Sequence, residues 1–431
     1  MKVLPVQLNT YKGINANYEN HDCSKPCPKP YNSNTDLKYM PVYFGNIASK
    51  ASQKLTTNFA KEIAAQPEVL EKLIGKYFNK TGTVNMDLNI TPEQMQQFKR
   101  IHIIASGSSK NASEMAATYI EKSTDVPVIV ESASEFMCKK SPINPTDDLF
   151  IYVSQSGQTA DTLKALEKTN RLGINSIAIT NKPESVIATR ANSHIYLDAG
   201  EEKAVAATKT VTSSIFNLMA IGLKLGELKG SLESKLIDYA VTKLKYLPDK
   251  IRTMLKYSHD VEQASNILAK ADNIYYYAKG SNIGAAKEGA LKLTETTGKR
   301  VISDSSGEAL HGTFASIKPE NPVVQIITGN YDYNYTSAEK NIIEIINKRK
   351  VKNPIIITEE SNKLLKNELN SAFKDKKITY LGLPNTHATS EELSPILATV
   401  KFQQLTEAIT RKLGIDPDNG NGFLTKFRKE I

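Results

Sequence analysis

The 431-residue sequence has no tryptophan, only three cysteines, and no apolar run close to the roughly 20 residues of a membrane-spanning helix. Three cysteines are too few for a disulfide framework, and Cys23 and Cys27 form a C-x3-C pair without the further ligands of a zinc site. The N-terminus also lacks the apolar core of a signal peptide. These absences predict a cytoplasmic protein that neither crosses a membrane nor holds a metal.

The charged residues are scattered along the chain, with 55 basic and 46 acidic residues giving a net charge of +9. A nucleic-acid-binding protein gathers lysines and arginines into a stripe with interleaved aromatic residues, and no such stripe is present. Hydrophobic residues make up 40% and charged residues 23%, which is typical of a globular protein. The length favours two or three domains.

The chain begins with residues 1–58, which are rich in Asn, Lys, Pro and Tyr and show no apolar periodicity. Such a segment cannot bury enough apolar surface to offset the entropy of ordering, so we expect a disordered or extended tail. Apolar residues then recur at helical spacing over 59–77, and Pro67 marks a break or the start of a second helix.

From residue 100 onward, short apolar runs alternate with amphipathic stretches. The predicted strands form two sets: 101–105, 126–130, 149–153, 176–180 and 194–197, then 273–278, 323–328, 354–358 and 378–383. The alternation predicts an α/β fold with doubly wound parallel sheets. We expect a first domain over 59–246, a second over 247–413 and a C-terminal tail over 414–431.

The two strand sets open alike, because residues 101–109 and 274–282 each form a strand that turns through Gly-Ser into a helix. An internal duplication explains this correspondence. Helices predicted at 208–228 and 232–255 link the two halves, and a helix over 394–413 closes the second.

Two turns of the first half are rich in hydroxyl groups: Ser106-Gly107-Ser108-Ser109 and Ser154-Gln155-Ser156-Gly157-Gln158-Thr159. Both follow strands and open helices, at the sheet edge where ligands of doubly wound folds bind. Free N–H groups at a helix start favour a phosphate, and hydroxyls add donors. Taken alone, either turn can also be explained as ordinary helix capping. Neither matches a nucleotide-binding glycine motif.

Three segments resemble the isomerase half of glucosamine-6-phosphate synthase, which is built from two sugar-isomerase (SIS) domains. They are residues 154–162 (SQSGQTADT), 200–209 (GEEKAVAATK) and 288–295 (EGALKLTE). The similarity extends from about Phe59, where Lys61-Glu62-Ile63 and Gln66-Pro67 also match, to near the C-terminus.

The resemblance implies binding of fructose 6-phosphate without a metal or organic cofactor. It places the phosphate against Ser108, Ser109, Ser154, Gln155, Ser156 and Thr159, and the sugar against Val205. It also implies a homodimer in which His311 assists ring opening in the neighbouring subunit's site. The resemblance further implies that Glu295 shuttles a proton and that Lys426 forms a Schiff base. Lys292 lies three residues before Glu295 on the same helix face, so its spacing suits it to orient Glu295.

Without the resemblance, an acidic residue on a helix, a loop histidine and a lysine in a charged tail are usually solvated surface residues. Glu295, however, falls in the last helical turn before Gly298, where the helix dipole disfavours a carboxylate. That bias suits a base that works near neutral pH.

The sequence also departs from the family. Gly420-Asn421-Gly422 stands where the family usually has Pro-Arg, and Ala207, Thr294 and Lys279 replace a Ser, a Lys and an Arg. Position 2 is Lys2, where the full synthase has the cysteine nucleophile of its glutamine-hydrolysing domain. We therefore expect ammonia from solution or from a separate glutaminase chain.

Two other functions remain open from the sequence. The first is a phosphosugar amine deglycase or deaminase, which runs similar imine chemistry toward release of the amine. The second is a non-catalytic sugar-phosphate-binding regulator, which needs only the hydroxyl-rich turns.

Overall fold

The computed structural model describes residues 56–140, 142–329, 332–374, 376–385 and 390–419. Cys23, Cys27 and Lys426 lie outside the described residues, as does nearly all of the segment predicted to be an N-terminal tail. The described residues belong to one compact unit that contains both predicted strand sets.

The first set forms a five-stranded, all-parallel sheet in the order β2-β1-β3-β4-β5. Its strands are β1 (Arg100–Ala105), β2 (Val128–Ser132), β3 (Asp148–Val153), β4 (Asn175–Thr180) and β5 (Ser193–Tyr196). The second sheet is also parallel and follows the order β10-β9-β8-β6-β7. Its strands are β6 (Asn273–Ala278), β7 (Arg300–Ser305), β8 (Val323–Ile326), β9 (Pro354–Glu359) and β10 (Thr379–Leu383). Read from the other edge, this order matches that of the first sheet strand for strand, which supports the duplication.

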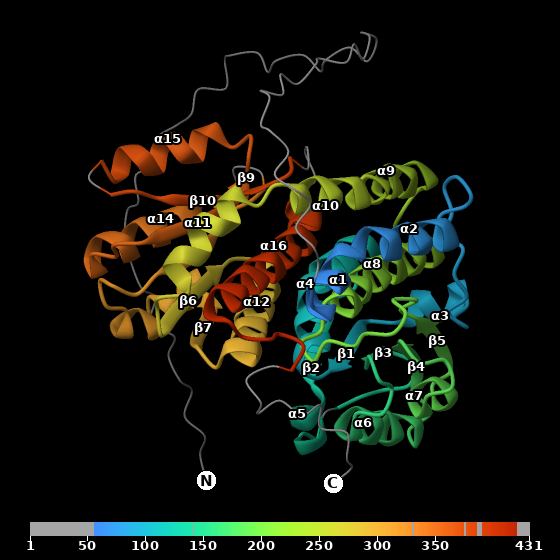
Figure 1. The fold of residues 1–431 in the computed structure, drawn as a ribbon. Coiled ribbons are helices and arrows are strands. Elements are labelled where there is room, and N and C mark those ends of the chain that lie inside the picture. The colour runs from blue at the N-terminus through green and yellow to red at the C-terminus, as the bar shows by residue number, and fades with distance from the viewer. Residues whose placement is uncertain (1–55, 141, 330–331, 375, 386–389, 420–431) are drawn as a thin grey trace, which may run out of the picture. The chain divides into compact units, whose positions relative to one another are not determined.

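Helices cover both faces of each sheet (Figure 1). Those up to the end of the first half are α1 (Asn58–Ala64), α2 (Gln66–Tyr77), α3 (Pro92–Gln97), α4 (Gly107–Thr124), α5 (Ala133–Cys138), α6 (Ala160–Asn170), α7 (Val186–Arg190), α8 (Lys209–Lys229) and α9 (Ser234–Lys245). The later ones are α10 (Leu247–Lys256), α11 (His259–Leu268), α12 (Asn282–Thr297), α13 (Ser306–Ala309), the 3-10 turn η1 (Thr313–Ser316), α14 (Tyr333–Arg349), α15 (Lys363–Ala372) and α16 (Ser390–Leu413). The predicted α/β class with two doubly wound parallel sheets is confirmed.

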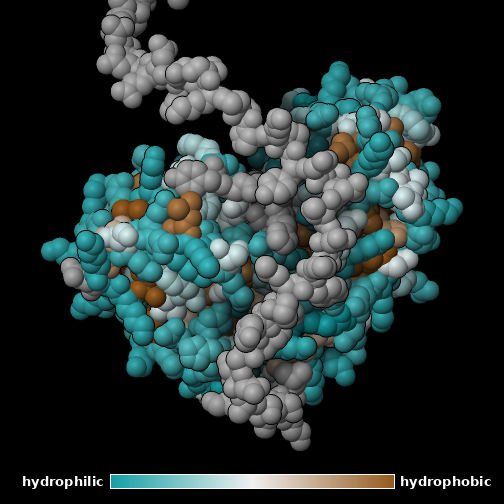
Figure 2. All heavy atoms as spheres, turned by 90° about the horizontal axis from the view of Figure 1, so that it is seen from above, coloured by the Kyte–Doolittle hydropathy of each residue, from teal (hydrophilic) through white to brown (hydrophobic). Residues whose placement is uncertain are grey.

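The core follows the two-residue period of the strands. In β3, Leu149, Ile151 and Val153 face the layer of α4 and α8, while Phe150 and Tyr152 face α5, α6 and α7. The α4 side of the first sheet and the α12 side of the second belong to one continuous apolar core. The second sheet packs its other face on α14 and α15. In the view of Figure 2, the described surface is mainly hydrophilic, with hydrophobic residues in small separate patches.

Close packing joins the two halves where α12 crosses α4. Gly284 is the contact point, since a Cβ atom there would lie 2.6 Å from Met115 Cγ and 2.7 Å from the Asn111 carbonyl oxygen. Only glycine permits this approach, and it brings the first turns of α4 close to the middle of α12.

Three expectations need correction. The edge strand β7 is absent from the predicted set, because Arg300-Val301-Ile302-Ser303-Asp304-Ser305 carries too few apolar residues to show a strand pattern. The sequence pattern predicts a helix over 111–122, whereas α4 begins at Gly107, directly after β1. The segment around residue 126 joins the sheet only from Val128. In the described part of the chain, no helix is long and apolar enough to cross a membrane.

Candidate active site

In doubly wound sheets a crevice forms where the strand order reverses, and in the first sheet this point lies at the carboxyl ends of β1 and β3. These strands are neighbours, but the chain leaves β1 toward β2 on one side and proceeds from β3 toward β4 on the other. Their following turns therefore diverge, which is where doubly wound folds bind ligands. The two hydroxyl-rich turns predicted from the sequence are the turns that follow β1 and β3.

The first turn passes directly into α4. Ser106 is extended with φ of −135°, and Gly107 adopts φ of +55°, a conformation that favours glycine. Ser108 and Ser109 then lie in the first helical turn and are half-buried. Among the described residues, neither hydroxyl forms a hydrogen bond with a neighbour, so both remain available as donors.

The second turn is held by its own hydroxyl groups. Ser154 Oγ lies 2.9 Å from Thr159 Oγ1 and accepts from the Gly157 N–H at 3.1 Å. Ser156 Oγ accepts from the Gln158 N–H at 3.2 Å. Gly157 has φ of +64°, and a Cβ atom there would lie 2.2 Å from Ser185 Oγ. The turn therefore requires glycine at this position.

Helix capping does not account for these hydroxyl groups. Ser106 and Thr159 occupy the N-cap positions of α4 and α6, yet neither side chain accepts a hydrogen bond from the helix that follows it. The Gln155 carbonyl accepts from the Asn181 N–H at 3.0 Å, which fixes the backbone of the second turn against the end of β4. Both turns thus present free helix-start N–H groups beside hydroxyls.

A buried charge cluster occupies one face of α12. Lys292 is 2% exposed, and its Nζ lies 2.6 Å from Glu295 Oε2 and 3.5 Å from Glu288 Oε1. Glu288 is fully buried, whereas the side chain of Glu295 is 21% exposed. Glu295 is therefore the member of the cluster that is exposed to solvent. Gly298 ends the helix in the left-handed conformation, so Glu295 lies in the last turn as expected.

The surroundings of Lys292 keep it charged. Burial by itself disfavours the ammonium form, but the carboxylates of Glu288, Glu295 and Glu202 outweigh it, so the pKa of Lys292 is raised. Lys292 is therefore a fixed cation that holds Glu295 in place, and a neutral amine nucleophile is not expected at this position.

Two members of the cluster were not singled out from the sequence. Glu288 Oε2 accepts from Asn111 Nδ2 at 2.8 Å, which ties α12 to α4 near the first turn. Glu202 accepts from the N–H groups of Thr208 and Thr210 at 2.9 and 3.2 Å, at the start of α8. Both lie within segments used for the family resemblance, but a sequence pattern does not reveal which carboxylates are buried.

Val205 and His311 belong to other described segments. Val205 is half-buried in the segment between β5 and α8. His311 is exposed just after α13, and no hydrogen bond or ion pair joins its ring to Lys292 or Glu295. Lys426 lies outside the described residues, so its position relative to the cluster stays a prediction.

At the matching point of the second sheet, the ends of β6 and β8, polar side chains are paired with one another. Asn282 Nδ2 donates to Thr328 Oγ1 at 2.8 Å and to Ser394 Oγ at 3.0 Å. The Glu359 carboxylate accepts from the Gly329 N–H at 3.0 Å. The two crevices have therefore diverged. Among the described residues the Ser109 hydroxyl has no hydrogen-bond partner, whereas its counterpart Asn282 is paired with Thr328 and Ser394.

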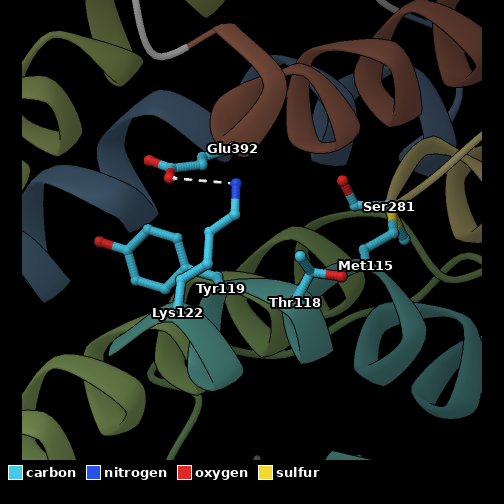
Figure 3. Close-up of a pocket in the computed structure, with 6 residues that line it drawn as sticks. All are labelled: Met115, Thr118, Tyr119, Lys122, Ser281 and Glu392. Atoms are coloured by element: carbon cyan, nitrogen blue, oxygen red, sulfur yellow. Dashed lines mark ion pairs between the residues drawn. The ribbon is translucent and has the colours of Figure 1, made fainter. Parts of the chain in front are cut away.

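A small pocket lies beside this second crevice (Figure 3). Its lining comes from α4, the turn before α12 and α16: Met115, Thr118, Tyr119, Lys122, Ser281 and Glu392. Lys122 Nζ and Glu392 Oε1 lie 3.8 Å apart, so an ion pair spans the pocket. Ser281 is the counterpart of Ser108 in the duplication.

The family model described as the SIS domain matches twice, over residues 94–224 and 267–395. Each match contains one of the two parallel sheets. The chain belongs to the SIS domain family. The resemblance noted from the sequence motifs is thereby confirmed, and both copies of the duplication are SIS domains.

Curated relatives of these SIS domains include two bacterial glutamine–fructose-6-phosphate aminotransferases (isomerizing). That of Streptococcus agalactiae is 34% identical over 301 residues, covering 70% of this chain and 49% of the relative. That of Caldanaerobacter subterraneus is 31% identical over 359 residues, covering 83% and 56%. The chain thus spans about half the length of the curated relatives it matches.

Among solved structures, the C-terminal domain of glucosamine-fructose-6-phosphate aminotransferase from Francisella tularensis matches with a TM-score of 0.75 and 28% identity. It covers 86% of this chain and 100% of that one. Glucosamine-6-phosphate deaminase from Thermotoga maritima matches with a TM-score of 0.62 and 19% identity, covering 86% and 99%. The second likeness shows a shared SIS fold.

Proposed function

We propose that this chain converts fructose 6-phosphate and ammonia into glucosamine 6-phosphate and water. The observation that carries the proposal is the buried Glu288–Lys292–Glu295 cluster, which presents one reachable carboxylate beside the helix that starts at the first hydroxyl-rich turn. The aminotransferase relatives supply the substrate class.

The two turns of the first SIS domain would hold the phosphate. Ser108 and Ser109 contribute hydroxyls and helix-start N–H groups from α4. Ser154, Ser156 and Thr159 contribute further hydroxyls from the turn before α6, with Gln155 between them. Hydrogen bonds to a charged group are worth about 1.5 to 3 kcal/mol each, so several of them suffice to select phosphorylated sugars.

The reaction needs no oxidant or reductant. The C2 ketone of the open-chain sugar loses its oxygen as water when an amine adds, which gives an imine. A base then removes a proton from C1 while the imine nitrogen gains one, which gives an enaminol. A proton is added to C2 while the C1 hydroxyl loses its own proton and becomes an aldehyde. Because the steps after imine formation only move protons, one well-placed carboxylate accelerates them.

Glu295 is the group proposed to carry the proton between C1 and C2. The ammonium group of Lys292 at 2.6 Å fixes the carboxylate orientation, and Glu288 holds Lys292 from the other side. His311 is proposed to assist ring opening in the site of a second copy. Lys426 is proposed to form the first imine at C2, and ammonia then displaces the lysine amine from C2 to give the imine that is isomerised. Ammonia would come from solution or from a separate glutaminase chain.

The test follows the C1 proton. Purified protein is incubated with fructose 6-phosphate in D₂O, with and without ammonium, and NMR measures both deuterium entry and glucosamine 6-phosphate formation. We expect exchange in the wild type and a loss of about 10²-fold or more in Glu295→Gln, with binding kept. Glu344→Gln, on the exposed face of α14, is the matched control.

The same experiment separates the other functions. A sugar-phosphate-binding regulator binds fructose 6-phosphate but never exchanges its C1 proton. A deglycase or deaminase catalyses the same equilibrium in both directions, so it is recognised by a faster initial release of ammonia from glucosamine 6-phosphate than initial amination of fructose 6-phosphate at high ammonium. Borohydride reduction during turnover checks Lys426, because a sugar adduct on this lysine should be absent from Lys426→Arg.

A further inference from the structure

The segment that carries Val205 is packed against α1. Phe59 and Ile63 of α1 form a small buried apolar cluster with Ala204 and Ala206, the two residues that flank Val205. Val205 itself is only half-buried and is not part of this cluster. The α1 helix therefore holds both neighbours of a residue whose own side chain keeps an accessible surface.

Two backbone hydrogen bonds fix the same segment. Glu62, also on α1, accepts from the Lys203 N–H at 2.5 Å through Oε1. The Val205 N–H donates to the Asp418 carbonyl oxygen at 3.4 Å. The segment is thus held on one side by α1 and on the other by residues close to the C-terminus.

Asp418 closes the arrangement by binding the start of α1. Its two carboxylate oxygens accept from the N–H groups of Asn58 and Phe59, each at 2.7 Å. These N–H groups have no partner within the helix, and a carboxylate is favoured at this end. Asp416 holds Asp418 in turn, because Asp416 Oδ1 accepts from the Asp418 N–H at 3.0 Å.

We propose that Glu62 and Asp418 are positioning residues that fix Val205 for recognition of the sugar, acting through α1. This inference rests on the proposed function, since Val205 is the residue expected against the sugar. Ordering a binding segment before the ligand arrives improves affinity, because less conformational entropy is lost on binding. The two hydroxyl-rich turns proposed to hold the phosphate belong to other segments. Loss of the Asp418 carboxylate should therefore change the affinity for the sugar without changing the affinity for phosphate.

The test compares two ligands in Asp418→Ala. Calorimetry measures the affinity of the full chain for fructose 6-phosphate and for inorganic phosphate. Losing the carboxylate at the start of α1 should weaken fructose 6-phosphate binding about five- to tenfold and leave phosphate binding within about twofold. Asp418→Asn keeps one acceptor oxygen and should restore part of the affinity.

Asp332→Ala is the matched control, since Asp332 accepts from the Tyr335 N–H at the start of α14 in the second SIS domain. It removes the same kind of helix cap and should leave both affinities unchanged. Equal losses for both ligands in Asp418→Ala, or no loss for either, would overturn the proposal.

Hydrogen exchange gives a readout that does not depend on the substrate. The amides of Lys203 and Val205 should exchange faster in Asp418→Ala than in Asp332→Ala, and equal rates would also overturn the proposal. If wild-type protein binds phosphate but not fructose 6-phosphate, the proposed function fails, while the exchange rates still decide whether Asp418 fixes the segment.

Discussion

At the residue scale, the hydroxyl groups of the second turn order the turn itself and are also the groups proposed to bind the phosphate. Ser154 and Thr159 bond to each other, and Ser154 also holds the Gly157 N–H, so the turn is ordered before any ligand arrives. We expect Ser154→Ala or Thr159→Ala to weaken phosphosugar binding about tenfold, measured by calorimetry. Thr328→Ala, at the corresponding crevice of the second SIS domain, is the control. If Thr328→Ala weakens phosphosugar binding as much as the other two variants, the phosphate site is not in the second turn.

Lys292 offers a second prediction at this scale. Replacing it by methionine leaves Glu288 and Glu295 without their cation in a buried site, which should lower the free energy of unfolding by about 3 to 5 kcal/mol. Denaturant titration measures this change. Glu288→Gln added to Lys292→Met should recover part of it. The exposed pair Lys348–Glu344 is the comparison, and Lys348→Met should cost less than about 1 kcal/mol.

The residues of the site differ in how far the sequence predicts them. The two turns could be located because strand, glycine and hydroxyl pattern coincide there. The other carboxylates around Lys292 could not, because Glu288 and Glu202 look like ordinary solvated acids until the packing of α4, α8 and α12 buries them. The position of a carboxylate on a helix is readable, but its desolvation is a property of the tertiary structure.

At the element scale, α14 and α15 share a pair of acids on the outer face of the second sheet. Burial and a hydrogen bond with Glu368 raise the pKa of Glu339 to about 7. The native protein therefore holds this proton more tightly than the unfolded chain, whose glutamates titrate near about 4.3. Titration of Glu339 should therefore lower the free energy of unfolding as pH rises from about 4.5 to 7. Above about pH 7 this group should cause no further change.

Glu339→Gln tests this pH dependence. The variant should raise the midpoint of thermal unfolding relative to wild type more at pH 8 than at pH 5, because it removes a charge that exists only at the higher pH. Glu344→Gln, exposed on the same helix, should show no such difference. Parallel shifts at both pH values for Glu339→Gln would refute the coupling.

Elements with strong apolar periodicity matched the sequence prediction, and those without it did not. The buried strands β3 and β9 lie within a residue of their predicted limits, since every residue in them is buried. The edge strand β7 pairs with β6 on one side only and carries polar residues, so backbone pairing alone defines it. A strand of that kind has no sequence pattern to detect.

At the scale of the whole molecule, the two SIS domains differ in what their crevices can bind. In the second crevice Asn282 is hydrogen-bonded to Thr328 and Ser394, and the carboxylate of Glu359 accepts from the Gly329 N–H. We therefore expect one molecule of fructose 6-phosphate per chain at saturation. Calorimetry measures this stoichiometry once the fraction of binding-competent protein is known. Two equivalent sites per chain would show that these internal hydrogen bonds open on binding.

The exposed position of His311 leads to a prediction about assembly. If His311 completes the site of a second copy, inactive His311→Ala and inactive Glu295→Gln chains should regain activity when mixed, since one composite site is then intact. Activity after verified subunit exchange measures this. No recovery would mean that both residues serve the same chain's site.

The shared apolar core also bears on how such a chain changes over generations. Met115 and Ala116 of α4 belong to the same buried cluster as Ala285 and Leu293 of α12. Each copy of the repeat therefore covers an apolar surface of the other copy. Loss of one copy by recombination would not restore a smaller ancestral protein. The remaining copy would expose this apolar surface to water and aggregate. The two copies are inherited as a single cooperative folding unit. The effect of a mutation in one copy therefore depends on the residues that it contacts in the other.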